Sequence, residues 1–124
     1  IYDCETNSLN VMEASIIGFS MSIEDSISCY IPLNHKSEEG KSLNQIQIND
    51  FCAIVKPILE DPAILKIGQN LKYDLIILKR LQISCQNYDE TMLMSYVLNF
   101  QDVLIPIFVF FRYGLVVMDT QPLV

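Results

Sequence analysis

The stretch from Lys66 to Leu81, KIGQNLKYDLIILKRL, constrains the fold more than any other part of the chain. Its opening apolar residues and Gly68 predict a strand followed by a turn. From Leu71 onward apolar residues recur every three or four positions, which predicts a helix, and Asn70 is expected to cap it by accepting a hydrogen bond from a free backbone N–H. Asp74 falls inside the apolar stripe, where a carboxylate is costly to bury unless a cation or a set of donors meets it. Asp74 is therefore the strongest functional candidate.

The charged residues of this predicted helix also have interpretations that involve no function. The opposite side of the predicted helix carries Lys72, Lys79 and Arg80, which are expected to face water. Asp74 has an alternative too, as a first-turn acid that points to solvent and gains from the dipole at the helix N-terminus.

The composition bounds the class of protein. A chain of 124 residues that is 51% hydrophobic and 19% charged predicts one folded domain. The net charge of −7 argues against a basic surface that grips nucleic acid by itself, so such a partner must be held locally or through metal. The four cysteines are widely spaced and form no zinc-binding pattern, which indicates reduced core thiols and a cytoplasmic location. No signal peptide is expected, because the chain opens inside a strand, as a trimmed N-terminus would.

The first strand carries two acids. Ile1–Glu5 is expected to be extended and Thr6–Asn10 to form the turn after it. Asp3 and Glu5 then project from the same face, with roughly 6.6 Å between their Cα atoms. Such a pair can flank a metal ion, although an Asp-x-Glu at a strand end is also common on solvated surfaces.

The remaining pattern predicts an α/β domain in which helices pack on a mixed sheet. Alternation over 15–23 and an apolar stretch over 28–33 predict a hairpin, and a polar loop with a solvated His35 follows. A helix is expected from Asn49 or Asp50, then a short strand near 84–88 and a helix over 91–98. The first of these helices is expected to bury four apolar residues: Phe51, Ile54, Val55 and Ile58.

The end of the chain has a different character. Residues 101–124 are apolar without an amphipathic period, and Pro106 and Arg112 interrupt them. A membrane span needs about 20 continuous apolar residues, so a membrane-associated protein anchored through Val103–Phe111 ranks low. A buried strand or an ill-fitting tail is preferred, and no membrane partner is expected.

Three acids from distant parts of the chain can meet over such a sheet. Without a cation they repel one another and raise one another's pKa values. Magnesium and manganese prefer oxygen ligands, and two such ions about 4 Å apart can activate a water and stabilise the leaving oxygen of a phosphodiester. Asp3, Glu5 and Asp74 therefore indicate metal-assisted phosphoryl chemistry.

Four segments carry a resemblance to a known family. Tyr2–Leu9 (YDCETNSL) resembles the first motif of the 3′-5′ proofreading exonuclease domain of family A DNA polymerases, the DNA polymerase I type. Ile67–Asp74 (IGQNLKYD) resembles the second motif nearly throughout. Tyr30–Leu33 and Thr91–Asn99 resemble further segments of the same domain in the same order. The resemblance covers residues 1 to about 99.

The resemblance implies a ribonuclease H-like fold of the DEDD superfamily and removal of nucleotides from the 3′ end of single-stranded DNA with Mg²⁺ or Mn²⁺. Asp3 matches the acid that bridges both metal ions. Glu5 matches a ligand of the ion that activates water, and Asp74 the helix acid that supports the second ion. Cys4 stands where the family usually has threonine, on the opposite face of the strand.

The resemblance also assigns substrate-binding positions. Leu9 matches an apolar residue that packs on the terminal base. The other matched positions line the DNA strand or brace the site: Thr6, Gln69, Asn70 and Tyr73.

One motif of the family is missing. The family completes its site with a tyrosine that orients water and, four residues later, a fourth acid, but no Tyr-x-x-x-Asp follows Asn99, and Tyr113 has Val117 at that spacing. We expect an exonuclease-like domain over 1–99, incomplete at its C-terminus, and a divergent apolar tail over 100–124. Activity is expected to be weak or lost, because positioning and charge stabilisation dominate phosphoryl transfer.

An alternative function and the possible contribution of other chains remain open at this point. The chain can instead be a non-catalytic remnant that binds metal or nucleotide, or that serves as an interaction module. A polymerase domain encoded separately can supply the DNA, and another chain can supply a fourth acid.

Overall fold

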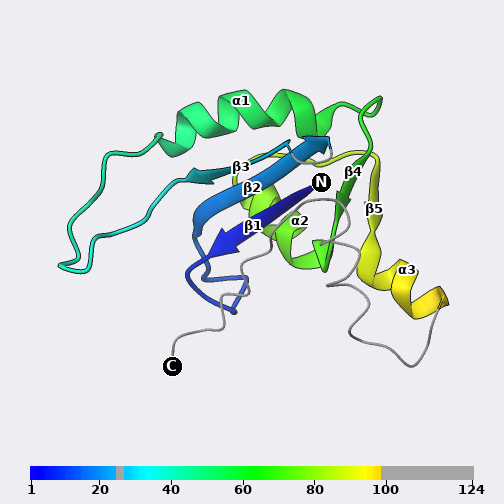
Figure 1. Cartoon of the computed structure of the whole chain (residues 1–124), viewed down its shortest axis with the longest axis horizontal. Coiled ribbons are helices and arrows are strands. Elements are labelled where there is room, and N and C mark those ends of the chain that lie inside the picture. Colours follow the sequence, from blue (N-terminus) through cyan, green and yellow to red (C-terminus); the bar gives the residue numbers. More distant parts are fainter. Residues whose placement is uncertain (25–26, 99–124) are drawn as a thin grey trace.

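The computed structural model describes residues 1–24 and 27–98. The predictions for residues 100–124 lie outside this range. In the described part no helix has the length and apolar character needed to cross a membrane. Figure 1 shows the order of the elements: β1 (Tyr2–Thr6), β2 (Ile16–Glu24), β3 (Ile27–Pro32), α1 (Ile48–Glu60), β4 (Lys66–Gly68), α2 (Leu71–Arg80), β5 (Tyr88–Glu90) and α3 (Thr91–Leu98).

The strands form two ladders. In the first, β2 pairs antiparallel with β1 on one side and with β3 on the other, which confirms the predicted hairpin. In the second, β4 and β5 run parallel, and β4 also contacts β1. The predicted mixture of strands and helices is therefore confirmed, with the short strand expected near 84–88 displaced to Tyr88–Glu90.

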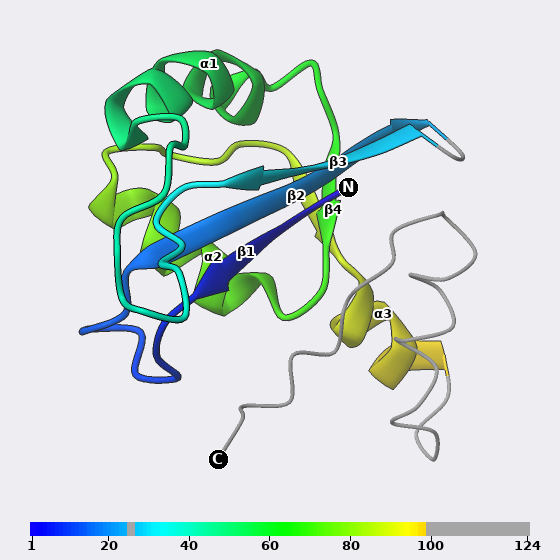
Figure 2. The ribbon, with the colours of Figure 1, turned by 60° about the vertical axis from the view of Figure 1, so that its left-hand side comes forward.

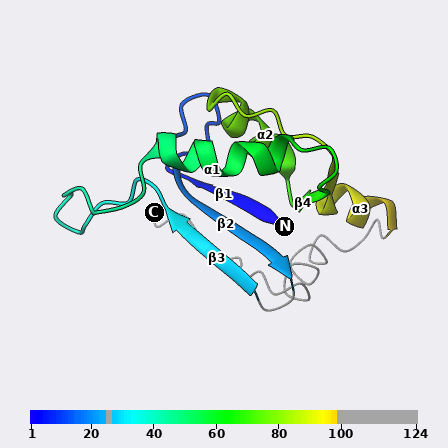
Figure 3. The ribbon, with the colours of Figure 1, turned by 90° about the horizontal axis from the view of Figure 1, so that it is seen from above.

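The core lies between the three-stranded ladder and two helices. Figures 2 and 3 show α1 and α2 beside this ladder, and one hydrophobic cluster joins both helices to it. At its centre the ring of Phe19 stacks on Tyr2, with centroids 5.7 Å apart, and meets Phe51 edge-on at 5.2 Å. Burial of such rings is a large part of the stabilisation of a small domain.

The buried stripe of α1 differs from the prediction. Phe51, Val55 and Leu59 are buried, four residues apart, and they define the face that meets the core. Ile54 and Ile58 were expected inside, but they are 59% and 36% exposed, because they lie to one side of this stripe. Sequence hydrophobicity alone did not separate the two sets.

The turn into α2 confirms the predicted strand, turn and helix, with one correction. A Cβ at Gly68 would come within 2.2 Å of the Leu71 side chain and 3.2 Å of the Tyr2 carbonyl oxygen, so the close approach requires glycine. The predicted Asn70 side-chain cap is wrong. Asn70 has a left-handed backbone (φ 54°, ψ 41°) and makes no side-chain cap bond.

The cysteines also correct the sequence analysis. All four are free, and Cys4 is buried as a core thiol. Cys29, on the outer strand β3, is exposed, so the prediction of four core thiols is wrong for this residue.

Candidate active site

The two faces of β1 have opposite chemistry. Tyr2 and Cys4 are buried in the core, whereas Asp3 and Glu5 are half-buried on the other face. Across the ladder Asp3 pairs with Ser20 and Glu5 with Gly18, so small side chains flank both acids. The strand therefore presents two carboxylates from one face while its other face holds the core.

Asp74 reaches β1 from the first turn of α2. Its side chain is only 3% exposed, as its place in the apolar stripe predicted. Ile1 exchanges both backbone hydrogen bonds with Ser22 on β2, so in the antiparallel pattern the N–H of Cys4 points to the opposite edge of β1. There it donates to Oδ1 of Asp74 over 3.1 Å. The helix acid is thereby fixed at the residue between the two strand acids.

The acids perturb one another electrostatically. Burial, and then the charge of Glu5, raises the pKa of Asp3 to about 6. Burial, and then the charge of Asp3, raises the pKa of Asp74 to about 7, although the bond from Cys4 opposes the shift. Asp3 thus interacts with both other acids, and bringing all three to full charge is unfavourable without a counter-ion.

Two observations bear on a metal ion. In the part of the chain that the structure describes, the ion pairs are Lys41–Glu39 and Lys56–Glu60, so no side-chain cation neutralises the three acids there. Among the same residues, no group of three or more His, Cys, Asp or Glu side chains is arranged to hold a metal ion as it stands. The oxygen-only donor set nevertheless fits magnesium or manganese by its chemistry.

Thr6 and Tyr73, two of the predicted substrate positions, lie together. Their hydroxyl oxygens are 2.7 Å apart, and each also lies within hydrogen-bonding reach of the carbonyl oxygen of Ser8, that of Thr6 at 3.1 Å. These bonds tie the start of the β1–β2 loop to the first turn of α2. The geometry matches a bracing role at the edge of the acid site.

The other predicted substrate positions are more dispersed. Leu9 is 88% exposed on the β1–β2 loop, where its side chain is free to meet an apolar partner. Gln69 is half-buried and Asn70 exposed in the turn before α2.

Sequence analysis missed Glu90 and Arg80. Both oxygens of Glu90 accept backbone hydrogen bonds, Oε1 from Asn70 at 2.5 Å and Oε2 from Leu93 at 2.7 Å. Arg80 was expected to face water, but its guanidinium donates to the carbonyl oxygens of Val11 and Ala14, at 2.8 and 2.5 Å. An acid directly before a helix is a signal for the first role, whereas no local signal announces the second.

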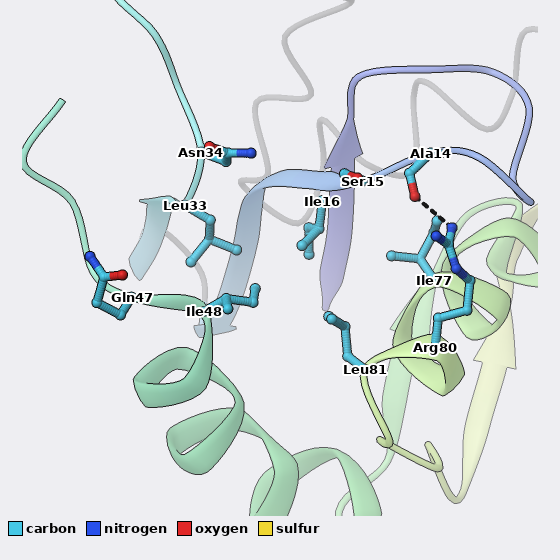
Figure 4. Close-up of a pocket in the computed structure, with 10 residues that line it drawn as sticks. All are labelled: Ala14, Ser15, Ile16, Leu33, Asn34, Gln47, Ile48, Ile77, Arg80 and Leu81. Carbon is cyan, nitrogen blue, oxygen red and sulfur yellow. Dashed lines mark hydrogen bonds between the residues drawn. The ribbon is translucent and has the colours of Figure 1, made fainter. Parts of the chain in front are cut away.

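A cavity of about 420 Å³ lies elsewhere in the molecule. Figure 4 shows it between the start of β2, the end of β3 and the two helices, with Arg80 bonded to Ala14 at its edge. None of the three acids lines it. This cavity is thus separate from the candidate active site.

Comparison with known proteins identifies relatives. Residues 1–117 match the family model described as 3′-5′ exonuclease. The chain is 42% identical to a DNA polymerase I of Rhizobium leguminosarum and 36% identical to one of Pseudomonas aeruginosa, with 79% of this chain covered in each case. It spans only 11% of the length of each relative. The predicted division of the chain at residue 99 stays a prediction.

Proposed function

We propose a function from one premise: the chain belongs to the 3′-5′ exonuclease family of family A DNA polymerases. On this premise the chain hydrolyses phosphodiester bonds at the 3′ end of single-stranded DNA, with Mg²⁺ or Mn²⁺ as cofactor. The observation that carries the proposal is the bond from the Cys4 N–H to Asp74, since it holds the helix acid at the backbone of the residue between Asp3 and Glu5.

Each acid has a role in this proposal. Asp3, which interacts with both other acids, would hold both metal ions; Glu5 would hold the ion that activates water, and Asp74 would support the second ion. A divalent ion bound there supplies positive charge to the leaving oxygen and lowers the pKa of a bound water. The strand and the helix hold their carboxylates in place, and the bond from Cys4 orients that of Asp74.

The substrate approaches from the β1–β2 loop. The exposed Leu9 packs on the terminal base, and Gln69 and Asn70 line the DNA strand. The contact between the hydroxyls of Thr6 and Tyr73 braces the β1–β2 loop. A polymerase domain brings the DNA, since a chain of net charge −7 attracts it poorly by long-range forces. We propose that the exonuclease and the polymerase domain act together in the cytoplasm.

A second candidate function is binding of metal or nucleotide without hydrolysis. It is favoured by the residues after Asn99, which contain no Tyr-x-x-x-Asp, and by the three acids not being gathered around one point in the described residues. For the isolated chain we accordingly propose hydrolysis that is slow.

A nuclease assay separates the two candidates. The purified chain is incubated with Mn²⁺ and an oligonucleotide labelled at its 5′ end, which reports stepwise shortening from the 3′ end. We expect slow shortening that Asp3→Ala abolishes, with Glu39→Ala, an exposed surface acid, as matched control. Equal rates for the parent and Asp3→Ala would show that these acids are not catalytic. Metal binding without shortening would favour the second candidate.

A further inference from the structure

The face that carries Asp3 and Glu5 also carries a tyrosine. In the ladder Asp3 pairs with Ser20 and Ser20 with Tyr30, so these three residues form a row across β1, β2 and β3 on one face. Figure 3 shows the three strands side by side, with β1 and β3 ending at the same end. Tyr30 is thus on the same open face as the acids.

The side chain of Tyr30 extends from the row of Asp3 and Ser20 toward the neighbouring row, which contains Glu5. A Cβ at Gly18 would lie 1.9 Å from the Tyr30 hydroxyl oxygen, so the phenol occupies the space that any side chain at residue 18 would take. Gly18 is the ladder partner of Glu5. Because Gly18 has no side chain, the Tyr30 hydroxyl has the space to lie beside Glu5.

His35 holds this hydroxyl. Its Nε2 is 2.6 Å from the Tyr30 oxygen, with ring centroids 5.8 Å apart. The backbone of His35 is itself clamped by the side-chain amide of Gln45: its N–H donates to Oε1, and Nε2 of Gln45 donates to its carbonyl oxygen, both over 2.9 Å. The predicted solvated histidine is therefore a half-buried residue fixed at both ends.

Tyr30, held by His35, supplies a hydrogen-bond donor, which the three acids lack when they are ionised. Ionised carboxylates only accept hydrogen bonds, whereas the oxygens of a phosphodiester need donors. The phenol of Tyr30, unlike a carboxylate, carries a proton that it can donate. Tyr30 is 48% exposed, which leaves it accessible to a ligand.

We propose that Tyr30 contacts the substrate with the support of His35: the Tyr30 hydroxyl donates to a phosphate oxygen of single-stranded DNA beside Glu5, and the Nε2–H of His35 donates to the Tyr30 oxygen and holds it in place. The inference rests on the proposed function, because it takes the acids as the place where the phosphodiester binds. Tyr30 is the contacting residue, whereas His35 and Gly18 are positioning residues.

Binding of a thymidine tetranucleotide in Ca²⁺ tests the pair. The chain has one histidine, so its imidazole proton NMR signals belong to His35 without assignment. We expect the tetranucleotide to shift these signals and Tyr30→Phe, which keeps the ring, to weaken binding about tenfold with an unchanged Tm. Gly18→Ala moves the hydroxyl without deleting it and is expected to cause a similar loss. Tyr88→Phe, an exposed tyrosine on β5, is the matched control and stays within about twofold.

The outcomes separate the two proposals. If the tetranucleotide binds but leaves the His35 signals unshifted, or if Tyr30→Phe binds as tightly as the parent, the pair has no role even though the acid site stands. If the tetranucleotide does not bind at all, the inference is overturned. In that case Mn²⁺ decides the proposed function by itself, because an ion held by Asp3 and Glu5 broadens the nearby His35 signals and Asp3→Ala abolishes the broadening.

Discussion

The two helices α2 and α3 each begin beside a carboxylate, and the two carboxylates have opposite surroundings. Glu90, before α3, accepts backbone hydrogen bonds from Asn70, Met92 and Leu93. Asp74, in the first turn of α2, is bonded to Cys4 but is also buried beside the charge of Asp3. The negative charge of Glu90 is therefore stabilised by backbone N–H groups, whereas that of Asp74 is destabilised by burial and by the nearby charge of Asp3.

We interpret this difference as that between a structural acid, Glu90, and a proposed functional acid, Asp74. A carboxylate that accepts several N–H groups at a helix start stabilises the folded state. A buried carboxylate with like-charged neighbours is retained at the expense of stability, which is typical of sites that bind a cation or perform catalysis. The comparison predicts opposite responses to substitution at the two positions.

The largest expected effect is on hydrolysis. Asp74→Asn is expected to lower the Mn²⁺-dependent rate at least about 100-fold, because it removes charge where positioning and charge stabilisation matter most. Glu90→Gln should stay within about threefold of the parent. Rates from single-turnover shortening of an oligonucleotide check both variants, and a larger loss for Glu90→Gln would break the comparison.

The next effect is on the pH dependence of stability. The unfolded chain releases the Asp74 proton near 3.8 and the folded chain only near 7, so folding becomes less favourable as the pH rises between these values. Asp74→Asn removes this loss, and we expect it to be more stable than the parent at pH 8 without metal, by at most about 4 kcal/mol. Urea unfolding at pH 4 and pH 8 measures the difference, which should shrink toward pH 4. A constant difference would contradict the buried-charge interpretation.

A smaller effect of opposite sign is expected at Glu90. Glu90→Ala removes the acceptor for N–H groups at the start of α3 and should destabilise the chain by about 1 kcal/mol. Urea unfolding at pH 8 is again the measurement, with the exposed Glu39→Ala as the matched control that leaves stability unchanged. Stabilisation by Glu90→Ala would remove the distinction between the two acids.

The smallest effect tests the residue next to Asp74. Tyr73→Phe loses the hydroxyl that meets Thr6 and Ser8, and we expect a loss of about 0.5–1 kcal/mol in the free energy of unfolding. Tyr88→Phe, on the exposed side of β5, controls for loss of a hydroxyl as such. Equal values for the two variants would mean that the loop is not braced through Tyr73.

Local patterns predicted much of the fold and the placement of the three acids. The helical period placed Asp74 in a buried stripe, and the period of two placed Asp3 and Glu5 on one face, since both depend only on nearby residues. The left-handed Asn70, the bonds of Arg80 to the β1–β2 loop and the exposure of Ile54 were not predicted. These depend on contacts between segments distant in sequence, which periodicity does not report.

The pairing of Tyr30 with His35 illustrates the same limit for the site. The two residues are close in sequence, but the hydroxyl reaches the row of Glu5 because residue 18, on a different strand, is glycine. Periodicity and the resemblance to motifs found the acids, whereas only the register of the ladder connects Tyr30 and His35 to them.

The most direct test of a shared metal site at Asp3, Glu5 and Asp74 is an Mn²⁺ titration by calorimetry at pH 8. The account predicts that the parent chain and Glu90→Gln bind Mn²⁺ with similar affinity and that Asp74→Asn binds it at least about tenfold more weakly. If Asp74→Asn binds Mn²⁺ as tightly as the parent, the three acids do not share a metal ion and the account is contradicted.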